Sequence, residues 1–490
     1  MNLRFTALVL LVLVVLVGVV VYLNNKPAPE SPSKFIFGTP PADIEKLTYQ
    51  PANGPETVIQ KQAERWRIDS PITAWMDDYK AQNLINSITQ LAYLAQIQAD
   101  ASGSNSLAAN GLAPPQAVLT FTDEKGQNFT LNIGQQDAQG RLYVTSDRTP
   151  GLMDVVDGSW LSPLTQSPDN LRDMTLANFQ PDLVQSVTIT AGGKMSLITQ
   201  NENSAWTLTQ PIKAPIDTSK IQDWLNTLQG LTAQSFAPDT VASEGFKHGL
   251  GQIDVTFSAQ VPSVPQASLE IKLGSYTDLT EKNIYVESSQ NPGAAVVDAG
   301  ILTQLDVNAL RDHAVLHMDA NGATRIDVHW NVAGKPGAGV NWFLIRDKQG
   351  NWKAGDSEEH FGKGPLAATD SLVVQSLLSK LAGLQADQFV DNPDQSGSYG
   401  LSPPWMTIDI QIPGRTQDVK LDIGWPLKSG YTAFKTPDWP SLYLVKTANA
   451  GGLSPNDWKG VILKPPATIP ATITPTMEPA TAPATIPAGE

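Results

Sequence analysis

The sequence of 490 residues contains no cysteine. This absence excludes disulfide bonds, thiol catalysis, thiolate metal sites and lipid attachment through an N-terminal cysteine. Charged residues are scarce, at 17%, and 48 acidic against 33 basic residues give a net charge of −15. Nucleic acids and anionic membrane surfaces bind clustered lysine and arginine, and the sequence has no such cluster. Neither nucleic acid nor an anionic surface is therefore expected as a main partner.

Signatures of catalysis are also missing. The chain has no Gly-x-Ser-x-Gly elbow and no phosphate-binding loop ending in Gly-Lys-Ser/Thr. His313 and His317 are four residues apart, as metal ligands on a helix can be, but no carboxylate motif nearby completes a zinc ligand set. The two carboxylates of a glycosidase are recognised by their separation in the folded protein, and the sequence does not show that separation. We therefore expect no metal, no cofactor and no enzymatic activity, and a hydrolase ranks last among the candidate functions.

One ordered set of landmarks occurs three times. Trp66 is followed by Pro71 and Trp206 by Pro211, with apolar residues at equal offsets after each, while the third copy, from Trp352, fits one seven-residue insertion. The later landmarks are Gly111-Leu112, Gly249-Leu250 and Gly400-Leu401, then Leu131–Gly134, Ile271–Gly274 and Leu421–Gly424, then a closing tyrosine strand at Tyr143, Tyr285 and Tyr443. Such residues build cores and turns, so the repeat predicts three copies of one domain rather than three equivalent sites.

Within each copy, strand-like runs precede a proline turn, one amphipathic helix follows, and further strand-like runs come after the Gly-Leu pair. Three such runs are expected on each side of the helix. The sequence therefore predicts an α+β fold of three repeated units, each with several mostly antiparallel strands plus one amphipathic helix. The predicted units are residues 42–178, 179–320 and 321–463. The first two end on the same triplet, Leu171-Arg172-Asp173 and Leu310-Arg311-Asp312.

Residues 5–23 are almost wholly apolar and carry no charge. Nineteen residues at 1.5 Å each make about 29 Å of helix, enough to cross a hydrocarbon core, so we predict a transmembrane anchor. The alternative is a cleaved signal peptide, which usually has a shorter apolar core and a small-residue cleavage site. Arg4 places the N-terminus in the cytoplasm by the positive-inside tendency. The expected location is the cell membrane, with a single span and the bulk extracytoplasmic.

Two segments have the composition of linkers. Residues 24–41 are rich in proline, asparagine and serine and are expected to join the anchor to the first unit. Residues 464–490 are rich in proline, alanine and threonine, a composition that cannot build a core. They predict a disordered C-terminal tail, which can carry O-linked sugars, reach through an envelope or be inert.

The third unit differs from the others before its closing tyrosine. The spacing from the glycine landmark to the tyrosine is 9 residues in the first unit, 11 in the second and 19 in the third. The additional stretch contains Trp425, Tyr431, Phe434 and Trp439. Aromatic loops on a rigid scaffold often bind partners or sugars, so these four residues are the candidate ligand or partner loop. The alternative is that the loop folds back as a cap on the terminal repeat.

Together, the N-terminal segment and the repeated landmarks resemble the bacterial family known as domain of unknown function 4340 (DUF4340). The resemblance covers Ile44 to Trp458 and rests on landmarks that are structural rather than catalytic. It implies an extracytoplasmic envelope protein beside membrane machinery, since some members resemble auxiliary parts of transport systems related to gliding motility. It supplies no catalytic residues.

The expected function is that of a membrane-anchored, non-enzymatic accessory or interaction component of an envelope or ABC-type transport assembly. Its partners would be the membrane, through residues 5–23, and a membrane protein or transporter. The alternative is an envelope module that binds glycan or peptide through the aromatic residues of the third unit.

Overall fold

The computed structural model describes residues 34–37, 43–238, 245–258, 268–332, 335–355, 366–393 and 396–461. The predicted anchor at residues 5–23 and the predicted tail at residues 464–490 lie outside these ranges. Within the described ranges, no helix is both long enough and apolar enough to span a bilayer.

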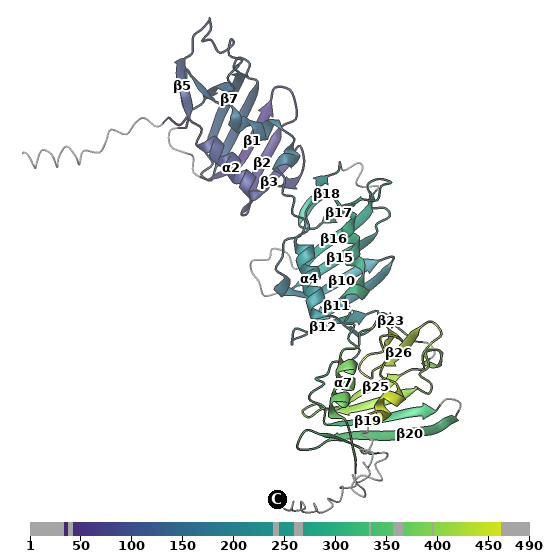
Figure 1. Ribbon diagram of the computed structural model, residues 1–490. Coiled ribbons are helices and arrows are strands. Elements are labelled where there is room, and N and C mark those ends of the chain that lie inside the picture. Colours follow the sequence, from purple (N-terminus) through teal and green to yellow (C-terminus); the bar gives the residue numbers. More distant parts are fainter. Residues whose placement is uncertain are drawn as a thin grey trace, which may run out of the picture. The chain divides into compact units, whose positions relative to one another are not determined.

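Three nine-stranded sheets follow one another along the chain, each with the same strand order (Figure 1). We call them, with their helices, repeats 1, 2 and 3. The first sheet runs β4-β3-β2-β1-β6-β7-β8-β9-β5. Two antiparallel meanders therefore meet at the central pair β1 and β6. This architecture agrees with the predicted three α+β units.

The strands of the three sheets have the following bounds. Repeat 1 contains β1 (Ile44–Pro51), β2 (Thr57–Gln62), β3 (Arg65–Ser70), β4 (Ala74–Trp75), β5 (Tyr93–Gln98), β6 (Ala117–Asp123), β7 (Asn128–Gln136), β8 (Arg141–Ser146) and β9 (Leu152–Asp157). Repeat 2 contains β10 (Val184–Ala191), β11 (Lys194–Gln200), β12 (Trp206–Gln210), β13 (Ala214–Pro215), β14 (Ser235–Phe236), β15 (Gly251–Phe257), β16 (Ser268–Tyr276), β17 (Asn283–Ser288) and β18 (Asn291–Asp298). Repeat 3 contains β19 (Arg325–Val332), β20 (Lys335–Arg346), β21 (Trp352–Gly355), β22 (Ala367–Ala368), β23 (Gln388–Val390), β24 (Met406–Gln411), β25 (Val419–Ile423), β26 (Tyr431–Lys435) and β27 (Leu442–Lys446).

By contacts, the chain divides into two compact units. One takes the residues up to 194 together with 223–306, and the other takes residues 195–222 together with those from 307 onward. The division therefore passes through the sheet of repeat 2.

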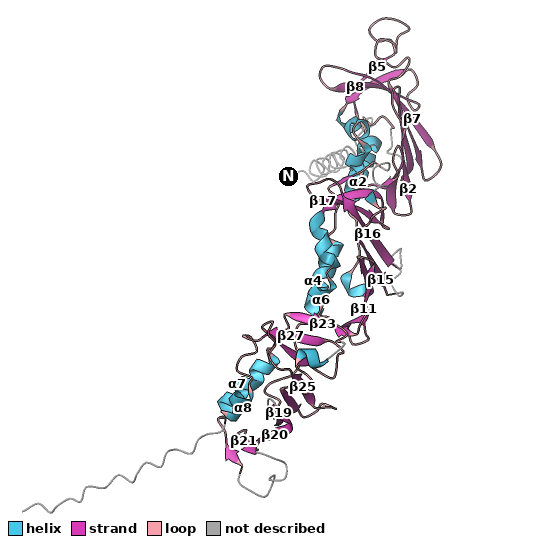
Figure 2. Ribbon diagram, turned by 90° about the vertical axis from the view of Figure 1, so that its right-hand side faces the viewer, coloured by secondary structure: helices cyan, strands magenta, loops and turns pink. Residues whose placement is uncertain are grey.

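One long helix belongs to each repeat and lies on one face of its sheet (Figure 2). These helices are α2 (Asp78–Thr89), α4 (Thr218–Gln229) and α7 (Ser371–Ala382). Each begins after an aspartate whose side chain accepts hydrogen bonds from backbone N–H groups of the first turn: Asp77, Asp217 and Asp370. The N–H groups of the first turn have no partner within a helix, so these caps fix where each helix starts. The cap of the first helix, Asp77, accepts from the backbone N–H of Lys80.

Shorter helical segments follow the last meander of each repeat. They are η1 (Ser159–Leu161), α3 (Ser162–Thr165) and η2 (Pro168–Leu171) in repeat 1, η4 (Ala299–Leu305) and α6 (Val307–Leu310) in repeat 2, and α8 (Pro455–Lys459) in repeat 3.

The sheets hold more strands than the sequence predicts. A fourth strand follows the Gly-Leu pair in each repeat, namely β9, β18 and β27, and an edge strand follows each long helix, namely β5, β14 and β23. A two-residue strand at the other edge precedes each long helix, namely β4, β13 and β22. The two edge strands β14 and β23 have only two and three residues. Such segments are too short to show an alternating pattern, so they escape detection by periodicity.

The alignment of the closing tyrosines is wrong for repeat 3. Ile133 of β7 pairs with Val144 of β8, and the equivalent Ile423 of β25 pairs with Phe434 of β26. Ala433 therefore takes the place of Tyr143, and it follows Gly424 by 9 residues, as Tyr143 follows Gly134. Tyr443 lies one strand later, on β27. The spacing of 19 residues is long because it extends past β26 to the next strand, β27. Repeat 3 therefore has no insertion at this point.

Two of the glycine landmarks have a steric cause. A Cβ atom on Gly134 would lie 2.2 Å from the backbone oxygen of Asn110, and one on Gly424 would lie 2.4 Å from that of Tyr399. The turn before each Gly-Leu pair therefore packs against the strand where only a hydrogen fits. This close approach explains why the landmark recurs.

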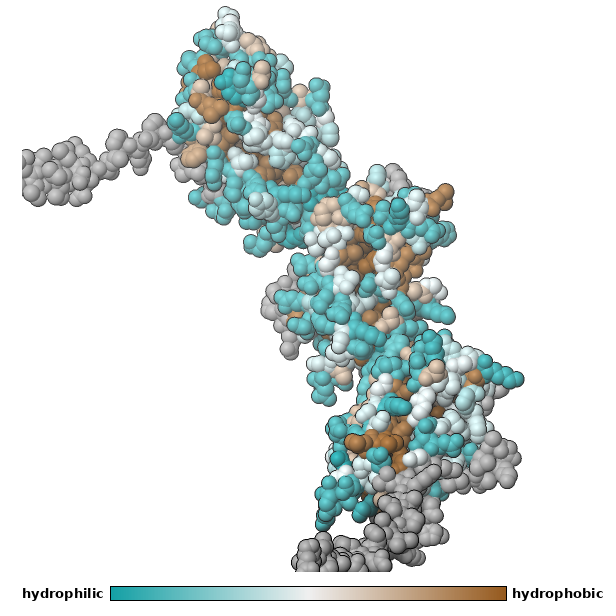
Figure 3. All heavy atoms as spheres, viewed as in Figure 1, coloured by the Kyte–Doolittle hydropathy of each residue, from teal (hydrophilic) through white to brown (hydrophobic). Residues whose placement is uncertain are grey.

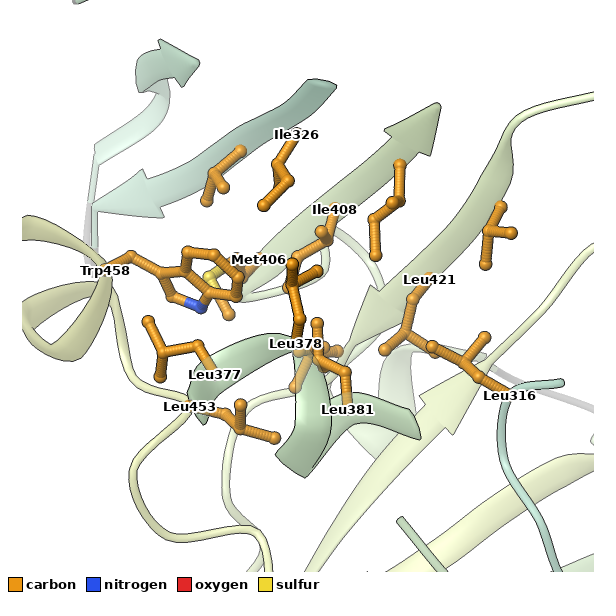
Figure 4. Close-up of a cluster of buried hydrophobic side chains, with 14 of the residues drawn as sticks. Leu316, Ile326, Leu377, Leu378, Leu381, Met406, Ile408, Leu421, Leu453 and Trp458 are labelled. Atoms are coloured by element: carbon orange, nitrogen blue, oxygen red, sulfur yellow. The ribbon is translucent and has the colours of Figure 1, made fainter. Parts of the chain in front are cut away.

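The core of each repeat lies between its sheet and its long helix. In repeat 3, Figure 4 shows Trp458 of α8 packing beside Leu377 of α7 and Met406 of β24. Trp458 is fully buried, and Val461 is buried with it. Residues after the last strand, namely Leu453, Trp458 and Val461, are thus part of the third core.

Candidate interaction site

The structure distributes the four predicted aromatic residues over different environments. Tyr431 and Phe434 both lie on β26, three residues apart, so their side chains project from opposite faces of the sheet. Phe434 is fully buried in the main core of repeat 3, while Tyr431 packs against a small cluster that contains Leu401. The four side chains do not form one surface, and Phe434 is not available to a ligand.

Trp425 and Trp439 are partly exposed. The ring of Trp425 lies 5.8 Å from that of Trp405, centre to centre, in a tilted arrangement. Trp439 lies in the turn between β26 and β27 and packs against the core of repeat 3. The ammonium group of Lys213 lies 5.9 Å from the centre of the Trp439 ring. Of the four predicted residues, Trp425, Tyr431 and Trp439 are partly exposed.

The two spaced histidines serve as structural contacts. The Nδ1 atom of His313 lies 2.6 Å from the backbone oxygen of Ala386. His317 pairs with Asp312, with 3.0 Å between Nε2 and Oδ2. The hydrogen bond to Asp312 raises the pKa of His317. Burial works to raise the pKa of Asp312, but hydrogen bonds from His317 and from the Ala314 backbone outweigh it and lower that pKa. Among the described residues, no group of three His, Asp or Glu side chains is placed to hold a metal.

A groove of about 520 Å³ lies between α2 and the segment from η1 to η2. Its polar lining includes Lys80, Asn83, Ser162 and Gln166, and the buried Trp160 borders it. The ammonium group of Lys80 donates a hydrogen bond to the backbone oxygen of Asn170. The residues that line the groove include no carboxylate and no histidine.

The most distinctive polar arrangement is built by the repeated Leu-Arg-Asp triplet. Arg311 is 1% exposed, and its guanidinium group donates to both carboxylate oxygens of Asp391, at 2.9 and 3.0 Å, and to the hydroxyl of Ser441 at 3.0 Å. The same guanidinium group lies over the ring of Phe389, 3.8 Å from its centre. Arginine is suited to this setting because its planar group can stack and donate several hydrogen bonds at once.

Arg172 makes the equivalent arrangement. It is 5% exposed, donates to the backbone oxygen of Pro292 at 2.9 Å and lies 3.4 Å from the centre of the Phe236 ring. Phe236 and Phe389 lie on the equivalent edge strands β14 and β23. In both cases the arginine that ends one repeat enters the edge of the next repeat.

A short backbone pairing accompanies each arginine. Leu176 N–H donates to Leu231 O and Ala233 N–H donates to Met174 O, at 2.9 and 2.7 Å. Val315 N–H and Ala386 N–H make the same bonds with Leu384 O and His313 O, at 3.0 and 2.7 Å. The segment after the triplet therefore pairs with the segment after the next long helix. We call the arginine contacts and this pairing together the arginine joint.

Sequence analysis identified the triplet but not its role. Its recurrence at the end of two units was the available signal, and a buried cation at such a boundary requires partners. Those partners, Phe236, Phe389 and Asp391, lie 64 to 80 residues later on short strands, a separation that spacing alone does not connect.

The class of protein defined by these features is a repeat protein of nine-stranded α+β units linked by arginine joints. The family model described as "Domain of unknown function (DUF4340)" matches residues 66–248 and 206–404. The chain therefore belongs to the DUF4340 family. No curated protein sequence matches it.

Similar solved structures were also found. A DNA polymerase sliding clamp from Pseudomonas aeruginosa, solved with a ligand, has 8% identity, and the match covers 85% of this chain and 96% of that chain with a TM-score of 0.15. A sliding clamp from Caulobacter crescentus has 8% identity, with 86% and 93% covered and a TM-score of 0.14. At such TM-scores these similarities carry no argument about fold or function.

Proposed function

We propose that the protein is a non-enzymatic interaction component of an assembly in the cell envelope, such as an ABC-type transport assembly. Residues 5–23 would anchor it in the membrane as a single span, and the three repeats would lie on the extracytoplasmic side. The apolar composition of residues 5–23 supports the anchor. Membership of the DUF4340 family is compatible with this role.

The observation that carries the proposal is that two buried arginine side chains each contact the next repeat. Arg172 and Arg311, both nearly inaccessible to solvent, are committed to joining one repeat to the next. Repeat proteins joined in this way present large surfaces to partners without requiring a catalytic centre. The face shown in Figure 3 is a mosaic of hydrophilic and hydrophobic residues in each repeat, which suits reversible contacts more than permanent ones.

The partner test uses the full-length protein with a C-terminal tag. Proteins are crosslinked in growing cells, purified through the tag and identified by mass spectrometry. An unrelated tagged single-span protein of similar abundance is the control. Enrichment of transporter subunits over that control supports the proposal. Recovery of the tagged chain without any enriched membrane protein contradicts it.

The location has a direct test because the native chain has no cysteine. Leu279 is fully exposed, so Leu279→Cys provides one accessible thiol. A maleimide that does not cross membranes should label this variant in intact cells, and the cysteine-free protein is the matched control. Labelling only after the cells are broken would place the repeats in the cytoplasm and contradict the proposal.

A second candidate function is binding of envelope glycan or peptide, favoured by the partly exposed pair Trp405 and Trp425. Trp425→Ala should then reduce retention on cell-wall material. Tyr79→Ala removes another exposed aromatic residue, in repeat 1, and serves as the control. Equal retention of the two variants and the unaltered protein would remove this candidate.

A further inference from the structure

Repeat 1 contains the backbone half of an arginine joint. Ile36 N–H donates to Leu91 O at 2.9 Å, and Tyr93 N–H donates to Lys34 O at 2.8 Å. These bonds match those of Leu176 and Ala233 in repeat 2. Residues 34–37 therefore take the place of residues 174–177 and 313–316, and Ile36 and Phe37 are buried in the core of repeat 1.

The register of the sheets also identifies the arginine-binding end of repeat 1. Phe236 pairs with Ala295, and Phe389 pairs with Tyr443. The equivalent pair in the first sheet is Gln96 of β5 and Asp154 of β9. Asp154 pairs with Val144 of β8, just as Ala295 pairs with Val286 in the second sheet, so Asp154 and Ala295 hold equivalent positions. Repeat 1 thus has an amide and a carboxylate where the other repeats have an aromatic ring against alanine or tyrosine.

Asp154 is fully buried and receives only neutral hydrogen bonds among the described residues. The Gln96 amide donates to it at 2.9 Å, and the Thr149 hydroxyl donates at 3.5 Å. Burial raises the pKa of Asp154, as expected for a carboxyl group that lacks a cation. A buried carboxylate is costly without such a partner, whereas a guanidinium group would satisfy both its charge and its hydrogen bonds.

A cavity of about 290 Å³ opens beside these residues, with Gln96, Thr149, Tyr93 and Phe35 in its lining. Arg148 is the cation at its border. The guanidinium group of Arg148 is engaged elsewhere, since it lies 4.2 Å from the centre of the Phe129 ring and donates to Asn128 O. Leu94, on the same edge strand, is 63% exposed. Among the described residues, Leu94 and Gln96 are thus exposed on the edge that the arginine covers in repeats 2 and 3, while Asp154 itself is buried.

We propose that this end of repeat 1, formed by Gln96, Thr149 and Asp154, is a receptor for an arginine side chain presented by a partner protein. The occupant is an arginine because the two equivalent ends in this chain each hold one. For repeat 1, the chain has no arginine at the sequence position equivalent to Arg172 and Arg311. Lys34 corresponds to Met174 and His313, so position 32 corresponds to Arg172 and Arg311, and residue 32 is a proline. This inference rests on the joints and not on the proposed function.

The test uses the full-length protein and a tripeptide probe, acetyl-Leu-Arg-Asp-amide, with binding followed by saturation-transfer NMR of the arginine methylene protons. Ligand-observed detection suits a weak complex of a large protein. The comparison probe replaces arginine by citrulline, which has the same shape without the charge. We expect saturable binding of the arginine probe, at least fivefold weaker binding of the citrulline probe, and loss of binding in Asp154→Asn.

Asp157→Asn is the matched control variant, because Asp157 lies on the same strand but is exposed. It should bind the arginine probe like the unaltered protein. Equal binding of the two probes, or equal binding by the Asp154→Asn and Asp157→Asn variants, would overturn the proposal.

A second variant covers the case in which Asp154→Asn fails to fold. Pro32→Arg places an arginine at the sequence position of Arg172 and Arg311. We expect this variant to exclude the arginine probe and to melt at a higher temperature than the unaltered protein, whereas Pro32→Gln should do neither. Unchanged probe binding by Pro32→Arg would argue that the probe does not enter the proposed receptor.

Discussion

Arg311 and Phe389 lie 78 residues apart in the sequence, yet the guanidinium group of the first covers the ring of the second at 3.8 Å. Arg172 and Phe236, at the equivalent positions one repeat earlier, make the same contact at 3.4 Å. A buried cation stacked on an edge-strand phenylalanine is therefore a recurring element of this fold. It makes the stability of one repeat depend on the chain that precedes it.

Arg311→Met tests this dependence. The substitution preserves much of the apolar volume but removes hydrogen bonds to Asp391 and Ser441. Hydrogen bonds to charged groups contribute about 1.5–3 kcal/mol each, and the exposed side of Asp391 can recover water, so we expect a loss of about 2–3 kcal/mol. Urea unfolding followed by tryptophan fluorescence measures it.

Arg141→Met is the control for this experiment. Arg141 also pairs with an aspartate, at 2.6 Å, but it is exposed, so its removal should cost less than about 1 kcal/mol. Equal effects of the two substitutions would mean that the joint contributes no more than a surface ion pair.

Gly424→Ala tests the steric origin of the glycine landmark. The added methyl group would lie 2.4 Å from Tyr399 O, which forces the turn away from the strand. Overpacking of this kind typically costs about 1–3 kcal/mol. Gly230→Ala is the control, because its nearest neighbour would be 3.6 Å away, and it should be nearly neutral. Thermal denaturation of both variants decides the matter, and an unchanged melting temperature for Gly424→Ala would contradict the explanation.

The repeat itself could be predicted because tryptophan, proline and leucine occur at fixed spacing, and packing requires them in every copy. The joint could not be predicted, since Phe236 and Phe389 lie on strands of two and three residues that carry no pattern.

Tyr443 illustrates a different kind of failure. It shares its local sequence with Tyr143 but belongs to the next strand, and burial raises its pKa to about 12. The local sequence suggested that Tyr443 is equivalent to Tyr143, whereas the strand register shows that Ala433 holds the equivalent position. The candidate aromatic loop was inferred by treating Tyr443 as the equivalent of Tyr143, and that alignment is wrong. The binding role of Trp425 stays a prediction.

The pair of His317 and Asp312 predicts a pH dependence. Because the folded pKa of His317 is raised above 6.5, its contribution is present below that pH and is lost as the pH rises through the folded value. The pKa of Asp312 is lowered from 3.8, so its contribution is lost as the pH falls through the lower, folded value. The pair should stabilise the protein most between about pH 4 and 6.5.

His317 is 58% exposed, so the effect should stay below about 1 kcal/mol. Urea midpoints of the unaltered protein and His317→Gln at pH 5.5 and 8 measure it. The difference between the two proteins should be larger at pH 5.5. A difference that is the same at both values would exclude the ion pair as its cause.

Two truncations test where repeat 3 ends. Ending the chain after residue 463 removes only the proline-, alanine- and threonine-rich segment, and the melting temperature of repeat 3 should not change. Ending it after residue 453 also removes Trp458 and Val461, which are buried in the third core. Loss of a buried tryptophan side chain alone costs about 3–5 kcal/mol, so repeat 3 should unfold at a clearly lower temperature. If both truncations melt alike, α8 contributes no stability, and the close packing of Trp458 on Leu377 is not what holds the last helix to the sheet.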